Sequence, residues 1–129
     1  MKLNKNLKNK NVLHISDMHV PYHHPDAVRF LKALQAKYSF DLVINLGDFM
    51  DFHNISFHKS DPSLYNAGDE LREARKHIAK IEKIFPEMFI IGSNHGDLPI
   101  RKMFDSGLPH ELLRDYNDIY DVGEGWKFP

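Results

Sequence analysis

This chain of 129 residues carries three short polar clusters, Asp17-Met18-His19, Gly47-Asp48-Phe49-Met50-Asp51 and Gly92-Ser93-Asn94-His95-Gly96-Asp97. Each cluster directly follows a short apolar run rich in β-branched residues, and the three runs are 12–15, 42–46 and 88–91. Such runs without clean alternation are typical of parallel strands that are covered on both faces. The sequence therefore predicts three buried parallel strands, each of which ends in a polar turn.

Two amphipathic segments lie between these strand-like runs, at about 25–38 and 67–85. Apolar residues recur on one stripe of each segment at the spacing of an α-helix. The stripes consist of Ala27, Phe30, Leu31, Leu34 and Tyr38 in the first segment and Leu71, Ala74, Ile78, Ile81 and Phe85 in the second. The order strand, helix, strand, helix, strand predicts an α/β fold, a β-α-β-α-β parallel sheet flanked by helices.

The segments outside this pattern carry weaker signals. Residues 52–68 have turn chemistry and no regular period, so we expect a long loop that overhangs the site and shapes substrate choice. Asn66 or Asp69 would cap the helix that follows this loop. Two short helices, each started by a proline, are expected at 99–106 and 109–116.

In an open parallel sheet, ligands bind in the crevice outside the carboxyl ends of the strands, where the loops converge. All three clusters fall at such ends. Asp17 and His19 can aim a carboxylate and an imidazole at one point, a pairing that suits Mn²⁺, Fe or Zn²⁺ better than Ca²⁺. Asp48 can bridge two ions and Asn94 can add an amide oxygen, which leaves His95 to act on a leaving group. Together the clusters predict one metal site.

Each cluster taken alone also has a simpler interpretation. Asp17 and His19 fit a turn, Gly47-Asp48 is a common strand ending, and residues 94–96 fit a left-handed turn because Asn and Gly tolerate positive φ. For a single cluster these interpretations are favoured by roughly two to one. The ordered set of three, each after a strand and separated by helices, reverses that preference.

The three motifs resemble those of the calcineurin-like metallophosphoesterases, which carry Asp-x-His, Gly-Asp-x-x-Asp and Gly-Asn-His-Asp/Glu in this order. The resemblance covers about residues 12–97, is especially close to shorter members of phage and prophage origin, and implies the first half of an αββα sandwich. It implies that Asp17 and His19 bind a first metal, that Asp48 bridges both metals and that Asn94 binds the second. It also implies that His95 protonates the leaving oxygen or steadies the transition state, while the metal pair activates a water for attack on phosphorus.

The third motif departs from the family pattern. Ser93 is inserted before Asn94, and Gly96 stands where an acidic residue is usual, with Asp97 one position later. This shift affects the support of the His95 imidazole, because the acidic neighbour normally orients that ring.

The second half of the family pattern has no counterpart in this chain. The family closes its site with a later histidine and a Gly-His-x-His motif, whereas His110 is the only histidine after His95. Residues 125–129 look like the entry to another strand. Three explanations compete: half of a split protein completed by a partner chain, a truncated product, or a shortened form that recruits local histidines. An incomplete sheet leaves unpaired backbone groups at its edge, which favours assembly with a partner or a second copy.

Local candidates for the absent ligands lie at 51–58. His53 and His58 follow Asp48 in a polar and aromatic loop and can approach the metals or the substrate, although exposed loop histidines are favoured by roughly three to two. Asp51 is expected to accept a hydrogen bond from a ligand imidazole. The other histidines are interpreted as a core residue of the first strand (His14), turn residues or lining of the pocket mouth (His23, His24) and a helix surface residue (His77).

Composition limits the class of protein. A chain of 129 residues with 42% hydrophobic content is expected to form one domain, 1–129, either complete or part of a larger one. The absence of cysteine excludes disulfides and thiolate ligands. No apolar run is long enough to cross a membrane and the first residues lack a signal-peptide core, so a cytoplasmic protein is expected.

The net charge of −1 hides a basic start. Four of the 17 basic residues fall in the first ten positions, which leaves 13 against 18 acidic residues in the remainder. We expect 1–11 to be a flexible, solubilising tail rich in Lys and Asn. No basic stripe with interleaved aromatics follows it, so charge does not support nucleic acid as a partner, although it stays a candidate.

The sequence thus predicts a metal-dependent phosphoesterase that hydrolyses a phosphomonoester or phosphodiester, with nucleotides and nucleic acids among the candidate substrates. The expected cofactor is a dinuclear pair of divalent ions, with Mn²⁺ first and Fe, Zn²⁺ or Ni²⁺ as alternatives. The alternative function is a metal-binding half-domain, inactive alone, that assembles with a partner chain supplying the missing histidines.

Overall fold

A computed structural model describes residues 10–129 of the chain. Most of the expected tail, residues 1–9, lies outside the described residues. Lys10 and Asn11 are tied to the region around the end of the first helix: Lys10 pairs with Asp41 at 3.1 Å, and the Asn11 side chain donates to the Tyr38 carbonyl oxygen at 2.8 Å.

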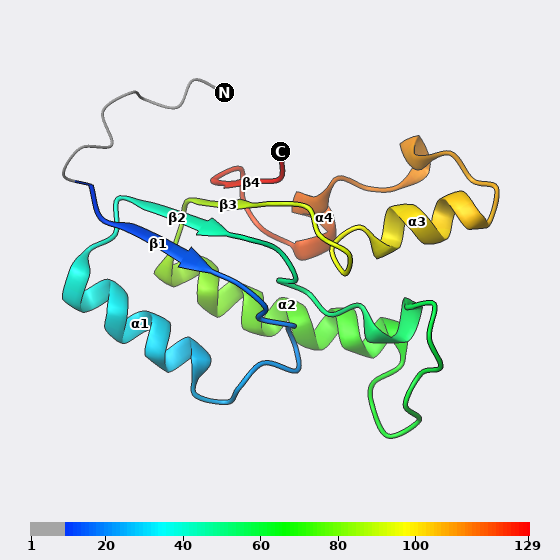
Figure 1. The fold of residues 1–129 in the computed structure, drawn as a ribbon, viewed down its shortest axis with the longest axis horizontal. Helices are drawn as coiled ribbons and strands as arrows, with labels where there is room; N and C mark the ends of the chain where they lie inside the picture. Colours follow the sequence, from blue (N-terminus) through cyan, green and yellow to red (C-terminus); the bar gives the residue numbers. More distant parts are fainter. Residues whose placement is uncertain (1–9) are drawn as a thin grey trace.

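The centre of the fold is a four-stranded sheet in which every pair of neighbouring strands is parallel (Figure 1). The spatial order of the strands is the order of the sequence: β1 (Val12–Ile15), β2 (Leu42–Asn45), β3 (Met88–Ile90) and β4 (Trp126–Lys127). The three predicted strands are therefore confirmed, and a fourth forms in the segment that resembled a strand entry. Because all strands run the same way, their carboxyl ends share one edge of the sheet.

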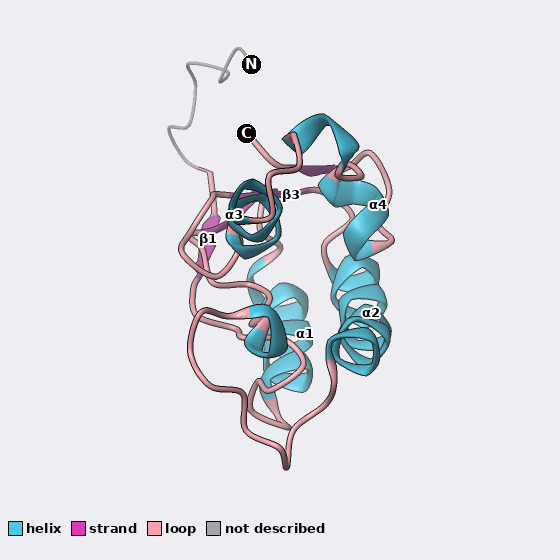
Figure 2. Ribbon diagram, turned by 90° about the vertical axis from the view of Figure 1, so that its right-hand side faces the viewer, coloured by secondary structure: helices cyan, strands magenta, loops and turns pink. Residues whose placement is uncertain are grey.

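Two long helices pack side by side under one face of this sheet (Figure 1 and Figure 2). They are α1 (Ala27–Tyr38) and α2 (Ala67–Ile84), close to the predicted bounds. Asn66 caps α2, since its side-chain oxygen accepts the backbone N–H of Asp69 at 2.9 Å. Ala74, Ile78 and Ile81 of α2 are fully buried against the sheet.

The opposite face of the sheet is more open, which corrects the expectation of strands covered on both faces. Burial alternates along β2 and β3, as in a strand with one buried face. Val12, Leu46 and Ile91, which alternate with the buried residues, are 36%, 48% and 45% exposed. His14 is exposed as well, so its interpretation as a core histidine is wrong. The apolar composition of the strands concealed this difference between the faces.

The segment after β3 contains one of the two predicted short helices. The elements are α3 (Leu98–Asp105), the 3₁₀ turn η2 (His110–Leu112) and α4 (Tyr116–Tyr120). The prediction of a helix at 109–116 is wrong. Leu113 is extended after a single turn, and the chain becomes helical again only at Tyr116. Short isolated helices gain too few hydrogen bonds to offset their nucleation cost, so tertiary contacts decide such segments. Here Arg75 of α2 donates to the carbonyl oxygens of Asp118 and Ile119 and thereby anchors α4.

The core joins β4 to the second polar cluster. Trp126 is fully buried, its Nε1–H donates to the Phe85 carbonyl oxygen at 2.9 Å, and its ring meets Phe49 edge to face at a centroid distance of 5.4 Å. Tyr120 stacks on the same Phe49 ring at 6.0 Å. The polar turn after β2 is therefore held by the aromatic packing of Phe49 against Trp126 and Tyr120.

Candidate metal centre

The turns after β1, β2 and β3 bring five of the predicted site residues together. Their ligand atoms form two overlapping groups, Asp17, His19 and Asp48 in the first and His19, Asp51 and His95 in the second, with all ligand atoms of each group within 4.8 Å of one another. All five side chains are partly or largely accessible. Residues from three separate clusters of the sequence thus converge at the carboxyl edge of the sheet.

The turns after β1 and β2 continue to pair beyond the strands. The backbone N–H of Asp17 donates to the Gly47 carbonyl oxygen at 3.3 Å, and that of His19 donates to the Asp48 carbonyl oxygen at 2.9 Å. Asp17, His19 and Asp48 all have left-handed backbones, with φ of 51°, 49° and 49°. Asp, Asn and His adopt this region more readily than other residues with side chains. The pairing fixes these backbones and so holds the three side chains together.

Gly47 is required by the close approach of β2 and β3. Its φ is +119°, and a Cβ at this position would lie 2.7 Å from the Ser93 Cβ. The Ser93 hydroxyl accepts the backbone N–H groups of Asp48 at 2.8 Å and of Gly96 at 3.1 Å. Asn45, fully buried at the end of β2, accepts the Gly47 N–H at 2.9 Å. Ser93, which interrupts the family motif, therefore links the second and third clusters.

Asp51 supports both imidazoles of the centre. Its Oδ1 lies 2.7 Å from His19 Nδ1, and its backbone carbonyl oxygen lies 2.6 Å from His95 Nδ1. A carbonyl oxygen only accepts, so His95 Nδ1 carries a hydrogen and Nε2 is the free ring nitrogen. A carboxylate in contact with His19 Nδ1 likewise directs the His19 Nε2 lone pair toward the ligands, where it lies 3.9 Å from Asp17 Oδ1.

His53 lies at the edge of the centre and is held there by a buried acid. His53 Nδ1 is 4.0 Å from Asp51 Oδ2, while its Nε2 accepts the backbone N–H of Asp61 at 3.0 Å. Glu70 of α2 is only 2% exposed and accepts the backbone N–H groups of His53 at 2.8 Å and Asn54 at 3.1 Å. Burial raises the pKa of Glu70, and the two N–H donors oppose that shift. These contacts fix the start of the 3₁₀ turn η1 (His53–Ile55).

Besides His53, three predicted site residues lie outside these groups. Asn94 is exposed in the turn directly before His95. His58 is exposed, and its backbone contacts only the Ser56 hydroxyl among the hydrogen bonds of the described residues. Asp97 is exposed at the start of α3, and a Cβ on Gly92 would lie 3.3 Å from its Oδ1.

The donor set fits a divalent ion. Burial opposes ionisation of Asp48, yet the hydrogen bonds from Ser93 and from the His95 N–H, together with the nearby imidazoles, hold the pKa of Asp48 below its usual value. An ionised carboxylate is the form that binds metal. Carboxylate oxygens combined with imidazole nitrogens suit Mn²⁺, Fe or Zn²⁺.

Sequence reasoning missed two supporting residues. Nothing in the local pattern distinguishes Glu70 from an ordinary acid in the first turn of a helix. Asn45 carries a readable signal, because an Asn two residues before a glycine can accept the backbone N–H in an Asx turn. Both residues act by fixing the backbone of a loop that carries site residues.

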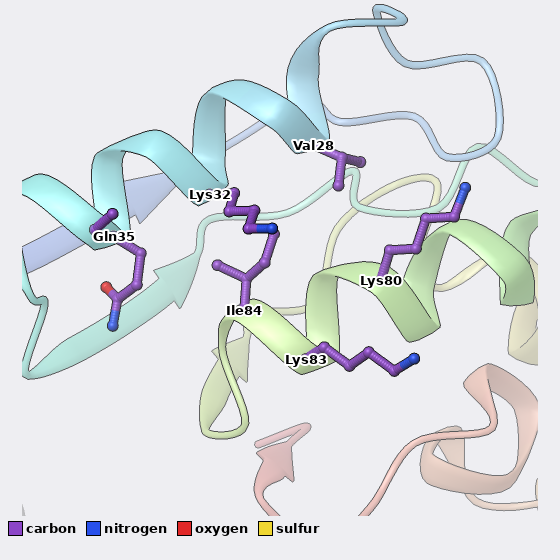
Figure 3. A pocket seen from close by; sticks show the side chains of 7 residues that line it. Val28, Lys32, Gln35, Lys80, Lys83 and Ile84 are labelled. Atoms are coloured by element: carbon purple, nitrogen blue, oxygen red, sulfur yellow. The ribbon is translucent and has the colours of Figure 1, made fainter.

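A separate groove of about 600 Å³ lies between α1 and α2 (Figure 3). It contains none of the candidate ligands and is lined by Val28, Lys32, Gln35, Ala36, Lys80, Lys83 and Ile84. His23 and His77, expected in a turn and on a surface, pack against each other near Lys80 with ring centroids 4.5 Å apart. Neither histidine belongs to the two groups of candidate ligands.

Comparison with known proteins identifies a family. A model of the calcineurin-like phosphoesterase family matches residues 10–128. This match extends past the three motifs and through β4. No curated protein and no solved structure matches the chain. Among residues 10–129, no helix has the length and apolar character that a membrane span requires.

Proposed function

Because the chain belongs to the calcineurin-like phosphoesterase family, we propose that it hydrolyses phosphate esters at the centre formed by the turns after β1, β2 and β3. The single observation that carries this proposal is the convergence of Asp17, His19 and Asp48, whose ligand atoms lie within 4.8 Å of one another. Two carboxylates and an imidazole thus lie at the carboxyl edge of a parallel sheet, which is where such sheets bind their ligands.

The residues have distinct roles in this proposal. Asp17, His19 and Asp48 would hold one divalent ion, and Asp48 and Asn94 would hold a second. Asp51 keeps the His19 ring oriented through the 2.7 Å contact. When bound, a pair of divalent ions, Mn²⁺ first among the candidates, would stabilise charge at phosphorus and acidify the attacking water.

His95 is the proposed proton donor to the leaving oxygen. Its Nδ1–H is engaged by the Asp51 carbonyl oxygen, so Nε2 is the nitrogen that can carry a proton to the substrate. Its own backbone N–H donates to Asp48 Oδ1 at 3.3 Å, which fixes the His95 backbone relative to that carboxylate. The Nδ1 contact with the Asp51 carbonyl oxygen orients the ring in place of the acidic neighbour that the third motif lacks.

The test is metal content together with hydrolysis of bis(p-nitrophenyl) phosphate in added Mn²⁺, for the wild type and for Asp48→Asn. We expect Asp48→Asn to lose bound Mn²⁺ and turnover together, since it removes the charge that would bridge the ions. The matched control is Asp118→Asn, an exposed aspartate of α4, which should keep both. Turnover that survives in purified Asp48→Asn would refute the proposal.

A second candidate is a half-domain that is inactive until a partner chain completes the site. The open sheet face favours it, because Val12, Leu46 and Ile91 leave apolar surface available for a second layer. The two candidates differ in native mass: a monomer that binds Mn²⁺ and hydrolyses the ester unaided rejects the partner model. Activity that appears only in an assembly supports it.

A further inference from the structure

The loop from 53 to 66 begins beside the metal centre and is closed by its own hydrogen bonds. His53 at its start is 4.0 Å from Asp51, and His53 Nε2 accepts the N–H of Asp61 in the middle of the loop. Asn54 Nδ2 donates to the Tyr65 carbonyl oxygen at 3.2 Å, which joins the two ends. The loop is therefore a closed platform attached to the edge of the centre.

Tyr65 presents an aromatic ring on this platform. The residue is 43% exposed, and its ring stacks on Tyr22 at a centroid distance of 6.1 Å and an interplanar angle of 28°. Tyr22 in turn meets the His53 ring edge to face at 6.3 Å. A partly exposed ring that already packs on another ring can stack with a planar group, and nucleic-acid bases are stacked in this way on exposed aromatic side chains.

Phe57 on the same loop holds two cations of α3 next to each other. Arg101 Cζ lies 4.9 Å and Lys102 Nζ 4.0 Å from its ring centroid. Within residues 10–129, neither cation forms an ion pair with a carboxylate. Two adjacent positive charges without an acidic partner attract an anionic ligand.

The helix that carries these cations starts beside the centre. The backbone N–H of Leu98, the first residue of α3, donates to the His95 carbonyl oxygen at 3.1 Å, so α3 starts at the turn that carries His95. Arg101 lies one turn into that helix. A ligand that places one phosphate in the metal centre and another on these two cations must carry more than one phosphate.

We infer that the substrate is a single strand of nucleic acid, with one phosphate in the metal centre, a neighbouring phosphate on Arg101 and Lys102, and a base on Tyr65. This inference rests on the proposed function and names its substrate class. A small phosphomonoester would use the metal centre and leave the ring and the cations without a role. A duplex keeps its bases stacked inside, whereas a single strand offers both unstacked bases and successive phosphates. The cations and the rings come from separate parts of the chain, which is why no basic and aromatic stripe is visible in the sequence.

Binding without turnover is the first test. A fluorescein-labelled oligothymidylate and an abasic strand of equal length are titrated in EDTA over a series of salt concentrations, with fluorescence anisotropy as the readout. Tyr65→Leu should weaken binding of the oligothymidylate by about fivefold or more and leave the abasic strand unaffected. Arg101→Gln and Lys102→Gln should weaken both strands and reduce the salt slope by about 0.7 for each phosphate that the variant no longer neutralises.

Matched controls make the same chemical changes elsewhere. Lys32→Gln removes a lysine from the groove between α1 and α2, and Phe30→Leu removes a ring that is 61% exposed on α1. Neither should reproduce the effects of the loop and α3 variants. Emission of Trp126, the only tryptophan, verifies that each variant is folded. Effects equal to those of the controls, or equal binding of thymidine monophosphate and the strand, would overturn the inference.

Hydrolysis separates this inference from the proposed function. With Mn²⁺ added, Arg101→Gln should lower the ratio of kcat/KM for the oligonucleotide to kcat/KM for bis(p-nitrophenyl) phosphate. A wild type that cleaves bis(p-nitrophenyl) phosphate but neither binds nor cleaves the strand defeats the inference alone. A wild type that binds the strand and hydrolyses no phosphate ester defeats the proposed function, while the binding surface remains supported.

Discussion

Asp51 illustrates how much of the centre depends on one residue. Its side chain contacts the His19 imidazole and its carbonyl oxygen accepts from the His95 imidazole. A substitution at this position can remove the first contact without the second, because only the first uses the side chain. The two imidazoles can therefore be examined separately.

We expect Asp51→Ala to weaken Mn²⁺ binding by about 10-fold to 100-fold, the usual effect of losing a group that orients a metal-ligating histidine. Asp51→Asn should cause a smaller loss, since its amide oxygen still accepts from His19 Nδ1 but carries no charge. Isothermal titration calorimetry with Mn²⁺ measures both, with Asp118→Asn as the control. An affinity of Asp51→Ala equal to that of the wild type would show that His19 is oriented by other contacts.

Gly47 gives a prediction about stability. In Gly47→Ala the new methyl group would lie 2.7 Å from the Ser93 Cβ, on a backbone with φ of +119°. We expect the free energy of unfolding to fall by about 2 kcal/mol or more, as for a residue forced into a sparsely populated conformation and a steric clash. Urea unfolding measures this change.

The control for Gly47 is Gly107→Ala. Gly107 also has positive φ, +71°, but nothing lies within 4 Å of its position for a Cβ. This variant should show only the conformational cost of about 1 kcal/mol. Equal losses in the two variants would mean that the contact with Ser93 adds nothing.

Helices and strands were predicted well where a period spans the whole element. The stripes of α1 and α2 repeat over several turns, so both helices lie close to their expected bounds. The second predicted short helix failed because a segment with one turn of signal follows its tertiary contacts, here those of Arg75 with α4. The exposure of one sheet face was not predictable from the sequence either, because Val12, Leu46 and Ile91 are as apolar as the buried residues beside them.

The convergence of the three clusters was predictable for a different reason. Polar residues directly after apolar runs must lie at the edge of a parallel sheet, so the sequence alone indicated that the three clusters converge. The contacts that fix them were not predictable, since Glu70 and Ser93 reach distant backbone groups. Local sequence carries no information about which distant N–H an oxygen will accept.

The contact between the α1 entry loop and α2 predicts sensitivity to acid. Burial is the main cause that lowers the pKa of both His23 and His77 from the ordinary 6.5, and the Lys80 cation adds to it, while Glu73 at 3.5 Å opposes the shift of His77. As the pH falls, these two imidazoles therefore take up protons at a higher pH in the unfolded chain than in the folded chain. Stability contributed by the neutral pair is present above about pH 6.5 and is lost as the pH falls toward the lower folded values.

We expect His77→Phe, which keeps a ring against His23 but cannot titrate, to reduce the loss of unfolding free energy between about pH 7.5 and about pH 5.5. Urea unfolding at both pH values measures the difference. His58→Gln, at an exposed histidine of the 53–66 loop, is the control and should keep the wild-type dependence. An unchanged pH dependence in His77→Phe would exclude the pair as its source.

For the molecule as a whole, Trp126 reports whether the last strand belongs to one cooperative unit. It is the only tryptophan, is fully buried and contacts both Phe85 and Phe49. We expect its fluorescence and the far-ultraviolet circular dichroism to change together in one urea transition. An earlier fluorescence transition would show that β4 detaches before the remainder of the sheet unfolds.

The left-handed backbones at Asp17, His19 and Asp48 restrict which ligands a designer or natural variation can install at this centre. Asp, Asn and His enter that conformation at modest cost, whereas β-branched residues meet a higher steric cost there. Exchange of one oxygen or imidazole donor for another is compatible with the turns as they stand. A donor outside this small set would add the cost of a left-handed backbone, about 1–2 kcal/mol, to the change of side chain. The turns therefore favour aspartate, asparagine and histidine as donors whichever ion binds.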